Sequence, residues 1–353
     1  MAAWSDPELP VQVKYHPHLL TIVLNRPRVL NTLNLQMIRL IHQALKEARA
    51  NDRVRLVLLQ GAGGQGFCAG GDLKALARAI QEKARPQAMA FFRQEYALDL
   101  FIHQFPKPLM VLADGITMGG GLGLAAGADI VVATERTRMA MPETRIGFFP
   151  DVGATGWLFN KCPPGYPEYL ALTGYEMLGG ECVRLGLATF LLETTRLPEL
   201  FEILGKISER LSLGKDEAVK QLQQALAPLA DTAIPAKPEK DAWVATHFAG
   251  KATLQEIMAS LSSCRMETGW CEEVFQRLSE RSPTALALTL KLLRLNEGRA
   301  LPEVFAREAR AAEFMVQHPD YQEGIRARLI DKDDRPHWRP ASLEEVEPLR
   351  VEF

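Results

Sequence analysis

The chain has 353 residues, of which 47% are hydrophobic and 24% charged, so it can bury a large core and is not a disordered segment. Lys and Arg total 41, Asp and Glu total 43, and the net charge of −2 comes without the basic block that nucleic-acid binding requires. These values favour a small-molecule substrate and no nucleic-acid partner.

Cysteine and histidine usage bears on compartment and metal binding. The five cysteines form no C-x-x-C pair, which predicts reduced thiols in a cytosol-like compartment, and the seven histidines lack a ligand spacing such as H-E-x-x-H. The N-terminal stretch MAAWSDPELP has no apolar signal core, and the apolar runs are shorter than a bilayer span. We therefore expect a cytoplasmic, soluble protein with no metal and no membrane partner.

The predicted elements begin with a hairpin and continue as alternating strands and helices. Asn34 is the expected N-cap of a helix whose apolar residues recur at three- and four-residue spacing from Met37 to Ala48. Further helical patterns extend to about Gln104 and recur near Leu122. Five short segments rich in large apolar and β-branched residues predict strands: 11–15, 19–25, 54–60, 109–114 and 129–134.

Strands that alternate with helices imply right-handed crossovers and a mostly parallel sheet, which is an α/β fold. From Gly165 onward strand signals nearly vanish, and the three prolines within 227–241 predict a linker. We therefore divide the chain into a core at 1–205 and a helical region at 206–353. Within that region, about 206–280 is an insertion and 281–353 forms C-terminal helices.

Gly61, Gly63 and Gly66 match the G-x-G-x-x-G dinucleotide pattern directly after a strand. In a dinucleotide-binding unit the third glycine already lies in a helix, whereas here FCAGGD intervenes before helical periodicity resumes at Leu73. The pattern therefore does not predict a nucleotide site.

Two glycine-rich loops, FCAGGD at 67–72 and GITMGGGLG at 115–123, each follow a strand and precede a helix. Because the carboxyl ends of parallel strands share one edge, both loops can present backbone N–H groups to the same crevice. Gly71 and Gly120 are the candidate donors of an oxyanion hole. The alternative is that Gly119 to Gly121 only permit close packing of a helix on the sheet.

The stretch MPETRIGFFPDVGATG sets Glu143 and Asp151 among apolar residues, prolines and glycines. Desolvation by such neighbours, and the charge of each acid on the other, would raise both pKa values and suit these groups to proton transfer. The alternative is structural: Glu143 caps a loop, and Asp151 N-caps a helix beginning at Val152. Cys68 has no histidine nearby in sequence, so we expect a small buried thiol rather than a nucleophile.

Three motifs in order, FCAGGD, ITMGGGLGLAAGADIVVAT and MPETRIGFFPDVG, resemble the crotonase superfamily of acyl-CoA enzymes. The resemblance implies a spiral of ββα units, a coenzyme A thioester as ligand, and oxyanion donors at Gly71 and Gly120. It also implies that Ala69 lines the adenine pocket. Other substrate-binding candidates in the same two loops are Gly70, Asp72 and Gly119.

Further segments, FFRQEY, SPTALALTLKLL and EGIRARLIDKDDRPHW, resemble the 3-hydroxyisobutyryl-CoA hydrolase subgroup. By motif position, Glu143 and Asp151 match its catalytic carboxylates, and Glu95 and Gly120 match its substrate contacts. Hydratases of the superfamily carry a second catalytic glutamate where this chain has Gly123. The resemblance thus implies hydrolysis of a short-chain hydroxyacyl-CoA, with Glu143 as base or nucleophile.

Two rival functions stay open: an enoyl-CoA hydratase or isomerase that uses Glu143 alone, and a noncatalytic acyl-CoA-binding protein. Because coenzyme A is part of the substrate, no cofactor is expected. Arg26, at a strand end, is a candidate phosphate contact, with Lys74, Lys332 and Arg335 as weaker ones. Members of the superfamily commonly trimerise, so a homo-oligomer is possible.

Overall fold

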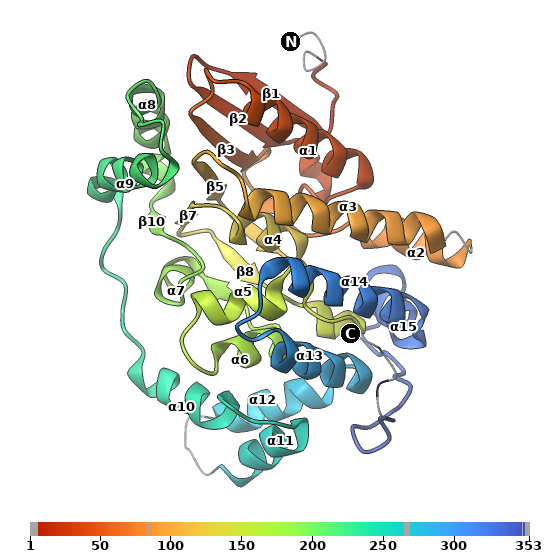
Figure 1. The fold of residues 1–353 in the computed structure, drawn as a ribbon. Helices are drawn as coiled ribbons and strands as arrows, with labels where there is room; N and C mark the ends of the chain where they lie inside the picture. Colours follow the sequence, from red (N-terminus) through yellow and green to blue (C-terminus); the bar gives the residue numbers. More distant parts are fainter. Residues whose placement is uncertain (1–5, 83–84, 265–268, 348, 350–353) are drawn as a thin grey trace. The chain divides into compact units, whose positions relative to one another are not determined.

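The computed structural model describes residues 6–82, 85–264, 269–347 and 349, which form two compact units (Figure 1). The first unit contains the chain up to Gly71 together with 97–139 and 177–236, and the second contains 72–96, 140–176 and the chain from Lys237. Each unit is built from segments that are distant in sequence. The predicted boundary between residues 205 and 206 falls inside the first unit.

The first unit contains a six-stranded sheet in the order β1-β2-β3-β5-β7-β10. β1 and β2 are antiparallel and the other neighbours are parallel, which confirms the opening hairpin and the mostly parallel sheet. The strands are β1 (Val11–Tyr15), β2 (Leu19–Leu24), β3 (Leu56–Gly61), β5 (Leu109–Ala113), β7 (Ile130–Thr134) and β10 (Phe190–Leu192).

A four-stranded sheet in the order β4-β6-β8-β9 was not predicted. Its members, and β10, have two or three residues, too few to show a period of two. β9 and β10 lie beyond Gly165, where strand signals nearly vanish in the sequence, so they were missed. The four strands are β4 (Gly66–Cys68), β6 (Ile116–Met118), β8 (Arg138–Ala140) and β9 (Met177–Leu178).

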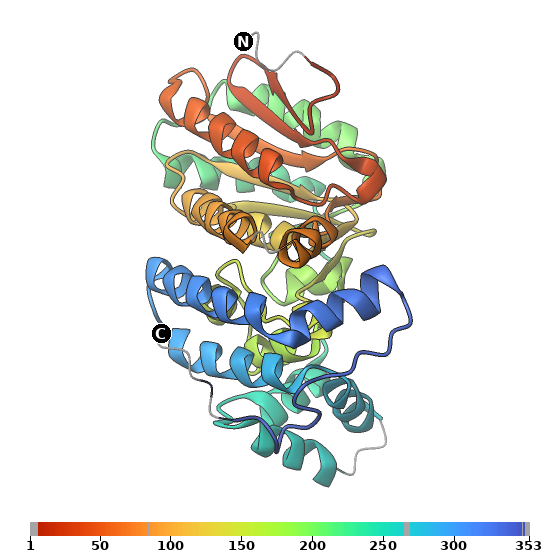
Figure 2. The ribbon, with the colours of Figure 1, turned by 90° about the vertical axis from the view of Figure 1, so that its right-hand side faces the viewer.

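Helices pack against the large sheet of the first unit. Leucines of α8 (Leu197–Ser208) and α9 (Lys215–Leu226) share a buried cluster with alternate residues of the strands. α1 (Leu35–Ala50) packs against β1 and β2 (Figure 2), and the Asn34 side chain accepts a hydrogen bond from Met37 N at 2.9 Å, which confirms the predicted N-cap. The unit also contains η2 (Pro27–Val29), α4 (Gly120–Ala126), α7 (Gly179–Arg184), η4 (Thr194–Arg196) and η5 (Ala227–Leu229).

The helical stretch predicted to end near Gln104 is two helices, α2 (Leu73–Gln81) and α3 (Arg85–His103). The division between the units falls within α3, after Tyr96. Both Glu95 and Tyr96 therefore belong to the second unit.

The second unit is almost entirely helical in its described residues, as predicted for the C-terminal part of the chain. α5, α6, α13 and α14 pack against one another. The predicted linker has no regular secondary structure from 231 to 237, and all of these residues except Lys237 belong to the first unit. The elements are η3 (Glu143–Ile146), α5 (Ala154–Lys161), α6 (Tyr166–Thr173), α10 (Pro238–Phe248), α11 (Leu254–Ser263), α12 (Trp270–Ser279), α13 (Pro283–Asn296), α14 (Leu301–Gln317), α15 (Pro319–Ile325) and η6 (Arg326–Ile330).

Cys264 and Cys271 are joined by a disulfide, so the expectation of reduced thiols is wrong for this pair. The packing of α11 against α12 brings their Cα atoms to 6.2 Å, and a separation of seven residues carries no sequence signal of pairing. Cys68, Cys162 and Cys182 are free. Within the described ranges, no helix is long and apolar enough to cross a bilayer.

Candidate active site

The two glycine-rich loops lie together in the first unit. β4 and β6 are parallel neighbours, so the loops that follow them leave the same edge of the sheet. Gly70 has φ of 96°, and a Cβ built on it would lie 3.1 Å from Met118 O and 3.5 Å from Gly120 N. The structure thus brings Gly70 and Gly71 beside Gly119 and Gly120. Gly66 lies in β4 rather than in a helix, which agrees with the rejection of a dinucleotide motif.

Close helix packing, the alternative role for these glycines, is observed at Gly121. A Cβ there would lie 2.2 Å from Cys68 O, a distance that no side chain tolerates. Gly119 is the N-cap of α4 with φ of 51°, and Gly120 is the first residue of the helix, where backbone N–H groups have no intrahelical acceptor. The role of Gly120 as an oxyanion donor stays a prediction.

A Gly121→Ala substitution should therefore destabilise the first unit, because either β4 or α4 must shift to admit the methyl group. We expect the free energy of unfolding to fall by about 1 to 3 kcal/mol, the range for an overpacked core. Gly205→Ala is the matched control: nothing lies within 4 Å of the added Cβ in α8, and alanine favours a helix. Equal thermal stability of the two variants would contradict this packing argument.

The remaining candidates of the first unit have structural partners. Ala69 N donates to Leu30 O at 3.0 Å, and Arg26 Nη1 donates to Thr32 O at 2.7 Å. Arg26 therefore shapes its own loop, and its phosphate contact stays a prediction. Cys68 is fully buried, with Sγ 3.8 Å from Gly70 O, as expected for a small core thiol.

The predicted carboxylates meet in the second unit. Glu143 begins η3 directly after Pro142, and its side chain is buried, as are those of Asp151 and Glu95. Tyr96 donates a hydrogen bond from its hydroxyl to Asp151 Oδ2 at 2.8 Å. Glu95 and Tyr96 are neighbours on α3, so one helix turn places two polar groups at this cluster.

Burial shifts the pKa of both acids upward, in the predicted direction. The pKa of Glu143 is raised well above its usual value by burial first and then by the negative charge of Asp151. Burial raises the pKa of Asp151 to about 7, although the hydrogen bond from Tyr96 opposes the shift. An acid that titrates near neutrality, as Asp151 does, can exchange protons with water or substrate.

These shifts predict that stability falls as pH rises. Asp151 keeps its proton in the folded state up to about pH 7 and loses it near pH 3.8 when unfolded, so its stabilising contribution is complete below pH 3.8 and is lost through pH 7. We expect the thermal midpoint to fall between about pH 4 and pH 7, and to fall less in Asp151→Asn. If calorimetry shows the same dependence of the thermal midpoint on pH in the wild type and in Asp151→Asn, this prediction is wrong.

Glu308, on α14, was not predicted as a site residue. Its carboxylate accepts hydrogen bonds from Gly153 N at 2.6 Å, Thr155 N at 3.2 Å and Thr155 Oγ1 at 2.6 Å. Glu308 thus caps α5, whose N-cap residue is Gly153, and the predicted N-cap role of Asp151 at Val152 is wrong. The bends around Gly153 place Asp151 outside the helix, because α5 begins only at Ala154.

The turn after Asp151 is strained and held from several sides. Val152 has φ of 52°, which a β-branched residue rarely adopts. Trp157 Nε1 donates to Val152 O at 3.0 Å, and Asn296 Nδ2 donates to Thr155 Oγ1 at 2.8 Å. These contacts, with Glu308, fix the backbone that carries Asp151.

A signal for Glu308 exists in the sequence. The buried face of α14 recurs through Val304, Ala311, Ala312 and Met315, and Glu308 lies on that same face. A carboxylate at an apolar position of an amphipathic helix needs a partner, which marks it as a candidate.

The charged candidates of the second unit are at its surface. Asp72 accepts from Ala75 N at 3.3 Å and N-caps α2. Lys74, Lys332 and Arg335 are exposed. Their contacts with coenzyme A phosphates stay predictions.

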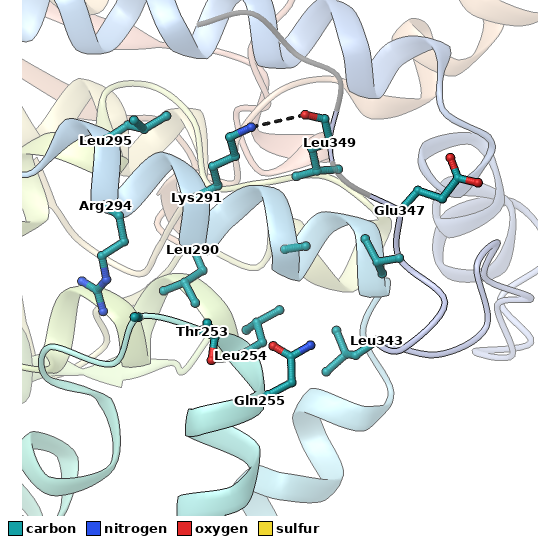
Figure 3. A pocket seen from close by; sticks show the side chains of 13 residues that line it. Thr253, Leu254, Gln255, Leu290, Lys291, Arg294, Leu295, Leu343, Glu347 and Leu349 are labelled. Carbon is teal, nitrogen blue, oxygen red and sulfur yellow. Dashed lines mark hydrogen bonds between the residues drawn. The ribbon is translucent and has the colours of Figure 1, made fainter.

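A pocket of about 450 Å³ in the second unit lies outside the carboxylate cluster. Leucines from α11, α13 and the C-terminal segment line it (Figure 3). Lys291 Nζ donates to Leu349 O at 3.3 Å, and Arg294 donates to Glu168 and to Lys251 O. The two cations that line this pocket therefore have protein partners.

One group of potential metal ligands occurs among the described residues: His247, Cys264 and Cys271, with ligand atoms within 4.8 Å of one another. The disulfide engages both sulfur atoms, so this group supports no metal site as it stands.

Paired glycine loops after parallel strands and a buried carboxylate cluster define a crotonase-type acyl-CoA enzyme. The enoyl-CoA hydratase/isomerase family model matches residues 19–353, and the chain belongs to that family.

Individual relatives agree with this assignment. The chain is 38% identical to the mitochondrial 3-hydroxyisobutyryl-CoA hydrolase of Xenopus laevis, over 92% of this chain and 83% of that one. The solved structure of a carnitinyl-CoA dehydratase from Mycobacterium thermoresistibile matches with a TM-score of 0.84 and 33% identity, over 96% of this chain and 94% of that one. An enoyl-CoA hydratase from Rhodobacter sphaeroides 2.4.1 matches with a TM-score of 0.84 and 32% identity, over 96% and 95%.

Proposed function

We propose that the chain hydrolyses a short-chain hydroxyacyl-CoA thioester, with 3-hydroxyisobutyryl-CoA as its substrate. The observation that carries this proposal is the buried pair Glu143 and Asp151, both with raised pKa values, in a chain that has Gly123 where hydratases have their second catalytic glutamate. Similarity to the hydrolase of Xenopus laevis supports the same substrate.

In this mechanism the N–H groups of Gly71 and Gly120 donate to the thioester oxygen as it gains negative charge. Glu143 either removes a proton from the attacking water or attacks the carbonyl carbon itself, and the two routes stay open. The water oxygen ends on the acyl carbon, the C–S bond breaks, and coenzyme A leaves as a thiolate. Asp151 and Glu95 hold the acyl hydroxyl and orient the water.

Enoyl-CoA hydratase or isomerase activity is the second candidate. The two solved structures that match with a TM-score of 0.84 are a dehydratase and a hydratase, which favours it. Hydration in this superfamily uses two glutamates, and Gly123 can hold no proton. A noncatalytic acyl-CoA-binding protein is the third candidate, against which the cost of burying several carboxylates argues.

Thiol release separates the three candidates. The purified chain is mixed with 3-hydroxyisobutyryl-CoA and a thiol reagent, and with crotonyl-CoA while the enoyl absorbance is followed. We expect thiol release from the hydroxyacyl substrate. Loss of the enoyl band without thiol release would establish hydration instead, and ligand-induced thermal stabilisation without turnover would establish binding alone.

We further propose that the reaction needs no cofactor or metal, because a thiolate leaves without assistance. Thiol release should therefore survive dialysis against a chelator. A role in valine catabolism follows from the proposed substrate.

We also propose a cytoplasmic location and a homo-oligomer, although the Xenopus relative is named as a mitochondrial protein. Imaging of the tagged full chain and light scattering test these two points.

A further inference from the structure

α15 packs against the segment that carries Glu143 with almost no space between them. A Cβ added to Gly147 would lie 2.3 Å from Asp320 O, and one added to Gly324 would lie 2.3 Å from Ile146 O. The backbones of α15 and η3 are therefore in direct contact at two places. Tyr321 lies between these two contacts on α15, so the backbone holds it against the segment that begins with Glu143.

The Tyr321 side chain is buried, with 1% of its surface exposed, and its ring lies 4.9 Å from that of Phe148. Its hydroxyl has no hydrogen-bond partner among the residues that the structure describes, and the same holds for Glu143 Oε2. Leaving a buried polar group unbonded costs about 1 to 3 kcal/mol. Two such atoms on adjoining segments indicate that a ligand supplies their partners.

The Tyr321 hydroxyl lies within the electrostatic influence of the acids. After burial, the charges of Asp151, Glu95 and Glu143 are the causes that raise its pKa, so the phenol stays protonated and is a hydrogen-bond donor at neutral pH. Tyr96 provides the contrast, because its hydroxyl is already bonded to Asp151. Of the two buried tyrosines at the cluster, Tyr321 is the one that can still donate to a ligand.

We propose that Tyr321 is a substrate-contacting residue that binds the hydroxyl group of the acyl chain and thereby selects hydroxyacyl-CoA thioesters over unsubstituted ones. An alcohol accepts one hydrogen bond and donates another, so it can accept from the Tyr321 phenol and donate to a carboxylate of Asp151 or Glu95. An acyl chain without the hydroxyl leaves both protein groups unpaired, which is the strongest form of discrimination a polar pocket offers. This inference rests on the proposed hydrolase function.

The test compares Tyr321→Phe with the wild type on 3-hydroxyisobutyryl-CoA and isobutyryl-CoA, which differ only in the hydroxyl. We expect kcat/KM for the hydroxylated substrate to fall about 10- to 100-fold, and that for isobutyryl-CoA to change less than about threefold. Tyr166→Phe is the matched control, because it removes a buried hydroxyl that is bonded to Asp241, which is not one of the acids Glu95, Glu143 and Asp151. It should leave the ratio of the two substrates unchanged.

Folding is measured in the same variants. Tyr321→Phe removes a hydroxyl that has no protein partner among the described residues, so its thermal midpoint should equal or exceed that of the wild type. A large drop in the midpoint would show a structural bond and overturn the proposal.

The kinetic outcomes are equally distinct. Equal losses on both substrates would assign the hydroxyl to the attacking water, and no loss on either would exclude it from the site; both overturn the inference. If the wild type releases thiol from neither substrate, it is the hydrolase function that fails.

Discussion

A Glu143→Gln substitution should lower kcat for thiol release from 3-hydroxyisobutyryl-CoA by about 1,000-fold, within the range that a positioned acid or base contributes. Glutamine keeps the shape of the side chain but can neither take a proton from water nor form an anhydride with the acyl group. Glu143 is buried, and its Oε2 has no hydrogen-bond partner among the described residues. The glutamine side chain therefore fits the same space without breaking a side-chain bond at that oxygen. Substrate binding should change much less than kcat.

The control for this variant is Glu297→Gln, an exposed glutamate of the same unit. Stopped thiol-release assays on both variants, with circular dichroism to confirm folding, give the comparison. A Glu143→Gln protein that turns over at more than a tenth of the wild-type rate would remove this residue from the proposed chemistry. If the Glu143 variant loses activity as expected, a search for a covalent acyl-enzyme in the wild type separates the two roles. A trapped acyl-enzyme would identify Glu143 as a nucleophile rather than a general base.

Glu308→Gln should cost both stability and activity. Three donors, from Gly153 and Thr155, point at the carboxylate, and the amide nitrogen of glutamine cannot accept from them. Burial raises the pKa of Glu308 to about 8, so the lost bonds are not counted as charge-assisted. We expect the free energy of unfolding to fall by about 1 to 3 kcal/mol, the cost of leaving a buried donor unsatisfied. The strained turn at Val152 should relax, displace Asp151 and lower kcat about 10-fold or more.

The pH profile tells electrostatics from mere loss of structure. The charge of Glu308 contributes to the raised pKa of Glu143, so its removal should lower that pKa and move the acid limb of kcat/KM to lower pH. Glu313→Gln, an exposed change on the same helix, should shift neither the limb nor the thermal midpoint. An acid limb that stays in place while kcat falls would assign Glu308 a purely structural role.

Much of the fold follows from signals contained within a few residues. The helix capped by Asn34 and the strands β1, β2, β3, β5 and β7 appear where apolar periodicity and local capping predict them, because these preferences act over one element at a time. The short strands β4, β6, β8, β9 and β10 could not be found in this way. Two or three residues show no period, and such strands exist only through the hydrogen bonds of their neighbours.

Site residues that belong to local sequence patterns were predicted, and contacts between distant segments were not. Glycine loops after strands, and two acids in an apolar stretch, are local patterns, so the amino-acid sequence alone marks Gly71, Gly120, Glu143 and Asp151 as candidates. The same loop left close helix packing open as the alternative role of Gly119 to Gly121, and no local pattern decides which glycine takes it. The contact at Gly121 depends on the backbone of Cys68 in β4, which leaves no space for a side chain.

The sequence by itself determined the local elements, the family motifs and the acids and glycines that carry the proposed chemistry. Only the tertiary structure decided that Glu308 bonds to Gly153, 155 residues away, that Tyr96 bonds to Asp151, and that the Tyr321 hydroxyl is buried without a partner among the described residues. Burial and long-range hydrogen bonds depend on which segments pack together, and no pattern within one segment specifies that packing.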